Sequence, residues 1–173
     1  EIVEKLMPEN YNNRAIIYLN IASDYRQLKI PSKGIGYLNK TAGFFTKLSG
    51  RLKMEFYNEY YENYISTDNT VKAISMLDSI QQGLSGFDLS DFQKLDFSLM
   101  LAKLRGNHAL KNQQNPDEAL KQFTSSLEFA RKLENNQEMK AFIISERISL
   151  KKRHTRQPFR IYRKHTTPQP ANP

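Results

Sequence analysis

The sequence contains no cysteine, few glycine and proline residues, and no long apolar run. The lack of cysteine excludes a disulfide framework and any metal site built on thiolates. No apolar stretch approaches the ~18–20 residues that a membrane-spanning helix requires. Only seven Gly and seven Pro occur in 173 residues, and no run shows the alternation, bounded by turn residues, that is typical of strands. The sequence therefore predicts an all-α fold.

Patterns typical of catalytic or metal sites are also missing. His108, His154 and His165 have no metal-ligand or catalytic spacing, the carboxylates are scattered, and no Ser-His-Asp signature occurs. We expect His108 to be a hydrogen-bonded or solvent-facing helix residue. These observations predict a protein that is not an enzyme, with no catalytic, metal-binding or cofactor-binding residues and no cofactor.

Acidic residues are absent after Glu146, which concentrates the positive charge at one end of the chain. The net charge is +8, but seven of the 26 Lys and Arg residues lie after position 150, so residues 1–150 carry 19 cations against 18 Asp and Glu. The basic residues of this tail are Lys151, Lys152, Arg153, Arg156, Arg160, Arg163 and Lys164. Such a tail is typical of a solvated linker, or of a segment that binds nucleic acid or an anionic surface.

A repeating helical pattern is present. The stretch from Asn115 to Asn135 begins with a cap residue, Pro116 and two acidic residues, which favour a helix start. An apolar stripe at helical spacing follows. Its members are Ala119, Leu120, Phe123, Leu127, Ala130 and Leu133.

The same small-then-large step recurs twice earlier in the chain. It occurs at Gly34, Leu38 and Thr41 and again at Ala73, Leu77 and Ile80, so the repeats are 39 and 46 residues apart. Each step follows another apolar helix. The residues of these preceding helices are Tyr18, Ile21, Ala22 and Tyr25; Tyr57, Tyr60, Tyr61 and Tyr64; and, with one inserted residue, Ala102, Gly106 and Ala109. We expect the tyrosines to form the core of the hairpins, with their hydroxyls at its rim.

These units resemble the tetratricopeptide repeat, which has a large residue, Leu-Gly and Tyr on its first helix and Ala, Phe and Ala on its second. The resemblance covers about residues 13–149, although the steps exceed the usual ~34 residues of that family. It implies an α-α superhelix of about three helical hairpins, with the remnant of a helix before it and a closing helix, residues 137–152, after it.

We expect three regions along the chain. Residues 1–12 form the end of a preceding helix, residues 13–152 the helical domain, and residues 153–173 a basic, proline-containing tail or linker. Asn12 or Asn13 is expected to cap a helix over 14–28, and Ser32 a helix that runs to about Leu48. Because Glu1 lies within what reads as a helix, we expect the chain to be a piece of a longer protein.

One stretch of the sequence nearly matches a phosphate-binding loop. The stretch from Gly34 to Thr41, GIGYLNKT, differs from G-x-x-x-x-G-K-[ST] at Asn39. That loop requires a preceding strand and a backbone that curls around phosphate, whereas this match lies in a helical stripe. We interpret it as structural.

The resemblance also implies a binding surface, because the first helices of tetratricopeptide repeats line a concave groove that binds peptides or partner proteins. The implied groove residues are Leu19, Asn20, Ser23, Arg26 and Gln27; Asn58, Glu59, Glu62 and Ile65; and Lys103, Asn107, Leu110 and Lys111. Leu19 and Ser23 stand where carboxylate-clamping members carry Lys and Asn, which argues against a clamp for chaperone tails. A mixed groove of this kind suits a polar peptide or a helix of another subunit, including a second copy.

The function that follows is a protein- or peptide-binding module. The helices resemble the sensory part of bacterial, Bacteroidetes-type regulators, in which such repeats precede a membrane span and a kinase or DNA-binding output. This resemblance implies a periplasmic location for a membrane-bound sensor and a cytoplasmic one otherwise. The alternative is a helical protein that binds nucleic acid or an anionic surface through its basic tail.

Overall fold

The computed structural model describes residues 2–133, which contain seven α-helices, one short 3-10 helix and no strand. The all-α prediction is therefore confirmed for this part of the chain. The basic tail and the expected closing helix over 137–152 lie outside the described residues.

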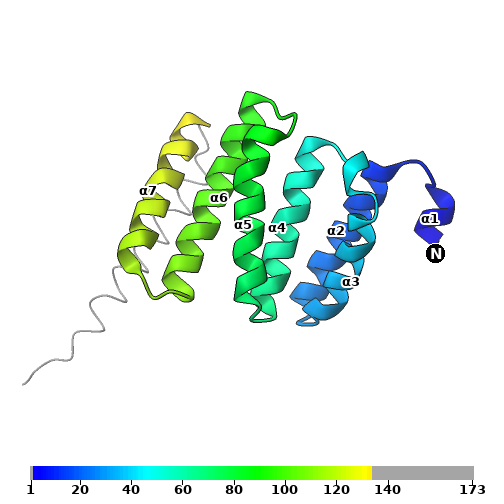
Figure 1. The fold of residues 1–173 in the computed structure, drawn as a ribbon, viewed down its shortest axis with the longest axis horizontal. Helices are drawn as coiled ribbons and strands as arrows, with labels where there is room; N and C mark the ends of the chain where they lie inside the picture. Colours follow the sequence, from blue (N-terminus) through cyan, green and yellow to red (C-terminus); the bar gives the residue numbers. More distant parts are fainter. Residues whose placement is uncertain (1, 134–173) are drawn as a thin grey trace, which may run out of the picture.

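The helices succeed one another in pairs (Figure 1). The short α1 (Ile2–Leu6) precedes α2 (Tyr11–Gln27) and α3 (Pro31–Ala42), and the 3-10 helix η1 (Phe45–Lys47) leads into the second pair. That pair is α4 (Gly50–Ser66) and α5 (Thr70–Gly86), and the third is α6 (Asp91–Lys111) and α7 (Pro116–Lys132). The closest packing is within pairs, and neighbouring pairs meet through α2 with α4, α3 with α4, and α5 with α6.

The turns inside the three pairs share one backbone feature. Lys29, Asp68 and Gln114 have φ values of 61°, 56° and 51°, the only positive ones among the non-glycine residues of the described chain. They lie 39 and 46 residues apart, the same steps as the sequence repeats, and each precedes the small residue of the next helix by five positions. The three hairpins thus turn at equivalent positions.

Local sequence signals explain where most helices begin. Ser49, Asn69 and Asn115 accept hydrogen bonds from backbone N–H groups in the first turns of α4, α5 and α7. Ser90 and Gln93 form a reciprocal capping box at the start of α6. Pro116 occupies the first turn of α7, as expected.

Three expected helix boundaries were wrong. The cap of α2 is Asn10, not Asn12 or Asn13, because the side chain of Asn12 instead accepts a hydrogen bond from the Ser49 backbone N–H at 3.1 Å. Ser32 does not cap α3, because Pro31 already occupies its first turn. This helix ends at Ala42 rather than near Leu48, since Phe44 and Phe45 turn onto the core.

The core consists of two main clusters and a small third one. The first joins α2, α3 and α4 around Ala15, Ala22 and Leu38, and the second joins α4, α5 and α6 around Met54, Ile80 and Leu104. The third, between α6 and α7, contains Ala109, Ala119 and Phe123. Each cluster uses the small residues of the repeat to let helices approach closely.

Gly34 shows why a small residue is needed there. A Cβ on Gly34 would lie 2.5 Å from Asn63 Oδ1 and 2.8 Å from the Ala22 carbonyl oxygen, closer than side chains pack. Gly34 therefore lets α3 contact both α2 and α4. The stretch from Gly34 to Thr41 lies within α3, which agrees with its structural interpretation.

Candidate partner-binding face

Four of the predicted groove residues lie together on α2 and α4. Arg26 Nη2 donates to Ser23 Oγ at 3.2 Å and forms an ion pair with Glu59 Oε2 at 3.5 Å. Arg26 Nη1 is 4.0 Å from Glu62 Oε2. We refer to Ser23, Arg26, Glu59 and Glu62 as the charged cluster.

The charged cluster exists because α2 and α4 pack side by side. Ser23 and Arg26 lie one turn apart near the end of α2, and Glu59 and Glu62 lie one turn apart near the end of α4. The two pairs come from different hairpins, 36 positions apart between Ser23 and Glu59. Only the contact between hairpins brings them within reach.

The charges of the cluster are unequal. One guanidinium faces two carboxylates, and the side chains of Arg26, Glu59 and Glu62 are 24%, 17% and 34% exposed. Burial raises the pKa of the Glu59 carboxyl, the charge of Glu62 raises it further, and Arg26 opposes both effects. The cluster is therefore a partly desolvated site with one more carboxylate than cation.

Two atoms of the cluster are buried without a hydrogen bond. They are Arg26 Nε and Glu59 Oε2, the latter held only by its ion pair. Polar atoms buried in this way cost free energy, because they have lost water and gained no replacement of equal quality.

The other predicted groove residues are distributed along the same helices. Asn20, Gln27, Asn107 and Lys111 are exposed, and Asn58 and Lys103 are partly buried. Lys103, Asn107 and Lys111 belong to α6, which packs mainly on α5 and α7. The structure therefore brings together Ser23 and Arg26 of the first set with Glu59 and Glu62 of the second, while the third set lies on α6, further along the row of helices.

Leu19 was wrongly placed in the groove. Its side chain is 5% exposed and belongs to the core cluster of α2, α3 and α4. Its neighbour Asn20 faces solvent. Leu19 lies on the same side of α2 as Ser23 and Arg26, four and seven positions before them, but its side chain packs into the core.

The tyrosines of α4 belong to the core, as expected. Tyr60 donates to Asn39 Oδ1 at 2.6 Å, and Tyr61 donates to the Leu104 carbonyl oxygen at 3.4 Å. Burial raises the pKa of each hydroxyl to about 12. The Tyr61 bond also ties α4 to α6 beside Lys103.

His108 differs from the expectation. It is neither exposed nor hydrogen-bonded: its side chain is 5% exposed, and neither Nδ1 nor Nε2 has a hydrogen-bond partner. The pKa of the imidazole is lowered, because burial disfavours its charged form. No sequence pattern indicates this burial, since a lone His on a helix is compatible with either face.

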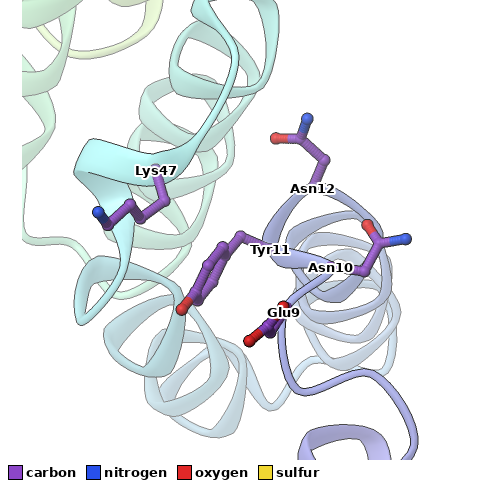
Figure 2. A pocket seen from close by; sticks show the side chains of 5 residues that line it. All are labelled: Glu9, Asn10, Tyr11, Asn12 and Lys47. Carbon is purple, nitrogen blue, oxygen red and sulfur yellow. The ribbon is translucent and has the colours of Figure 1, made fainter.

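A separate hollow lies beside the start of α2 (Figure 2). It has a volume of about 410 Å³ and is lined by Glu9, Asn10, Tyr11, Asn12 and Lys47. The side-chain oxygens of Asn10 and Asn12 already accept backbone hydrogen bonds from Asn13 and Ser49. This leaves the hollow without a free, buried polar group that would mark a ligand site.

Neither a metal-binding cluster nor a membrane-spanning helix occurs among the described residues. Between residues 2 and 133, no three His, Cys, Asp or Glu side chains are placed to share a metal ion. Over the same range, no helix has the length and apolar character needed to cross a membrane.

Comparison of the chain with protein-family models, with curated proteins and with solved structures found no match.

Proposed function

We propose that the chain is a protein-interaction module, without enzymatic activity, that binds a peptide or a helix of a partner protein along α2, α4 and α6. The charged cluster is the centre of the proposed surface. The exposed residues Asn20 and Gln27 on α2 and Asn107 and Lys111 on α6 extend it on either side.

The observation that carries this proposal is the ion network of Arg26, Glu59 and Glu62. A partly buried network of this kind is poor evidence for a stabilising role, because the desolvation of the charges offsets most of their attraction. It also leaves Arg26 Nε and Glu59 Oε2 without hydrogen bonds. The side chains of Arg26 and Glu62 nevertheless stay 24% and 34% exposed. A partner can therefore form hydrogen bonds with their accessible polar atoms, which is the arrangement expected of a binding surface rather than of a core.

The repetition of the hairpins supports the finer description of the fold. We propose that the three pairs form a tetratricopeptide-like superhelix, on the basis of the equivalent turns at Lys29, Asp68 and Gln114 and of the close contacts at Gly34 and Gly106. A Cβ on Gly106 would lie 2.6 Å from the Phe123 ring, so in the third hairpin too a glycine lets the two helices approach closely. In such folds the first helices face the partner.

The resemblance to bacterial regulators extends the proposal to a sensory role. A partner bound at α2 and α4 would stabilise one arrangement of the neighbouring hairpins, and the change would reach an output module elsewhere in a longer protein. This step depends on the resemblance alone.

The test is capture of a binding partner by the wild-type chain and by a triple variant, Arg26→Gln, Glu62→Gln and Lys103→Gln. We expect the triple variant to lose the partner, because it removes the charges of the proposed surface while each replacement stays polar and suited to a helix. Arg51→Gln is the matched control, since Arg51 forms an exposed ion pair with Glu55 near the opposite end of α4.

A partner captured equally by the wild type, the triple variant and the control would contradict the binding surface. Far-UV circular dichroism and the urea midpoint of each variant establish that a loss of binding is not a loss of fold. A partner lost by the control as well would indicate general charge attraction rather than a site.

The second candidate function rests on the seven cations after position 150, which no acidic residue accompanies. We propose binding of nucleic acid or an anionic surface by this tail as the alternative. It predicts an affinity that falls steeply with salt and disappears when residues 151–173 are removed. Retention of nucleic-acid binding after this truncation would exclude the tail as the cause.

A further inference from the structure

Three aromatic rings meet at the end of the molecule where α4 begins and α5 ends. They belong to Phe45 of η1, Tyr57 of α4 and Phe87, which follows α5. Ring centroids are 5.3 Å apart for Phe45 and Tyr57 and 6.3 Å apart for Phe87 with each of the others. We refer to these three residues as the aromatic corner.

The three rings pack against one another. The plane of Phe45 makes 63° with that of Phe87, while Tyr57 lies at 17° to Phe87 and stacks on it. Gly83 makes the position of Phe87 possible, because a Cβ there would lie 2.9 Å from the Phe87 ring. All three residues are partly buried, so each keeps some solvent-exposed surface.

The chain places one of its own cations in the aromatic corner. Lys53 Nζ lies 5.6 Å from the centroid of Phe45 and 5.3 Å from that of Phe87. Both distances are within the ~6 Å at which a ring face attracts a cation. The nearest acidic residue along α4, Glu55, is instead held by Arg51 at 2.8 Å.

The position of Lys53 therefore depends on ring faces rather than on a carboxylate. Among the residues from 2 to 133, no acidic side chain forms an ion pair with Lys53. Phe87 is also the residue at the end of α5, where the last carbonyl groups carry partial negative charge. Both features favour a cation at this point.

We propose that the aromatic corner is a binding site for small quaternary ammonium compounds, such as choline, and that the ammonium group of Lys53 occupies it in their absence. A quaternary ammonium is more weakly hydrated than the lysine head and covers more of each ring face, so it displaces Lys53 into the solvent. No covalent step is involved.

The site is independent of the partner-binding surface proposed above. Lys53 lies in the first turn of α4, whereas Glu59 and Glu62 lie in its second half. The Arg26→Gln, Glu62→Gln, Lys103→Gln variant is therefore expected to bind choline as the wild type does, so that either proposal can fail alone.

The test is a titration of the chain with choline, in which binding is monitored through the upfield shift of the choline N-methyl signal in proton NMR. Lys53→Ser, which removes the internal competitor, is expected to bind choline about tenfold more tightly than the wild type. Lys53→Gln, which keeps most of the side chain but not its charge, is expected to show a smaller gain in the same direction.

Three controls make the result specific. The neutral isostere of choline, 3,3-dimethylbutan-1-ol, should show no such gain, because it has the shape without the charge. Lys72→Ser removes a lysine that faces a single ring, Tyr64, at 5.6 Å, and should leave choline binding unchanged. Adding Phe87→Leu to Lys53→Ser should abolish the gain.

An equal choline affinity in the wild type and in folded Lys53→Ser and Lys53→Gln would overturn the proposal. An equal gain for the neutral isostere would also overturn it, because the corner would then be an apolar hollow. Persistence of the gain in the Phe87→Leu variant would locate the bound choline elsewhere.

Discussion

Gly34 and Gly36 lie on the same helix, two positions apart, and replacement of each by alanine should have opposite effects. In an unconstrained helix interior, Gly→Ala stabilises by about 1 kcal/mol through helix propensity. Gly36 meets this condition, because nothing lies within 4 Å of the position where its Cβ would stand. Gly36→Ala should therefore raise the free energy of unfolding by about 1 kcal/mol.

At position 34 the same gain is outweighed. The added Cβ would lie 2.5 Å from Asn63 Oδ1 and 2.8 Å from the Ala22 carbonyl oxygen, and the second of these is backbone. Overpacking costs ~1–3 kcal/mol, and a fixed backbone atom favours the upper end of this range. After subtraction of the helix-propensity gain, Gly34→Ala should lower the free energy of unfolding by about 2 kcal/mol.

The assay is urea unfolding followed by far-UV circular dichroism, with the midpoint and slope of each variant compared. The two variants should differ by about 3 kcal/mol, with unchanged slopes. The double variant Gly34→Ala, Asn63→Ala should recover part of the loss, since it removes one of the two close atoms. A Gly34→Ala protein as stable as Gly36→Ala would refute the close approach of α2, α3 and α4.

Two further predictions concern a turn and a buried imidazole. Gln114→Gly should raise the urea midpoint, because Gln114 has φ 51° and a left-handed non-glycine residue costs roughly 1 kcal/mol, whereas Gln113→Gly, as the control, should not. Burial lowers the pKa of His108, so the unfolded chain binds more protons than the folded one below about pH 6.5, and stability should fall as the pH falls through that value. The free energy of unfolding, measured by urea titration at neutral and at mildly acidic pH, should depend less on pH in His108→Leu than in the wild type. An unchanged pH dependence would contradict the lowered pKa of His108.

Helix positions were largely predictable because their signals are local. Asn115 and Pro116 act on backbone groups within a few residues, so the sequence alone indicated where α7 begins. The error at the start of α2 arose because a side chain had a distant alternative. Asn12 binds the backbone of Ser49, which is 37 positions away, and no local rule reveals that contact.

The candidate site was predictable only in part. The helical spacing and the resemblance selected Ser23, Arg26, Glu59 and Glu62, but the spacing within one helix cannot state whether two helices meet. The same spacing placed Leu19 in the groove, although that side chain is buried. A rotation of one helix by a fraction of a turn decides which neighbour faces the solvent, and packing sets that rotation.

The sequence by itself determined that the chain is helical, where its hairpins turn and which small residues recur, because these depend on short-range hydrogen bonds and periodicity. The tertiary structure alone decided which side chains of different hairpins meet. The ion network of Arg26, the burial of His108 and the two rings beside Lys53 all depend on contacts between segments that are separated in the chain. Such contacts follow from the packing of whole helices, which no local pattern encodes.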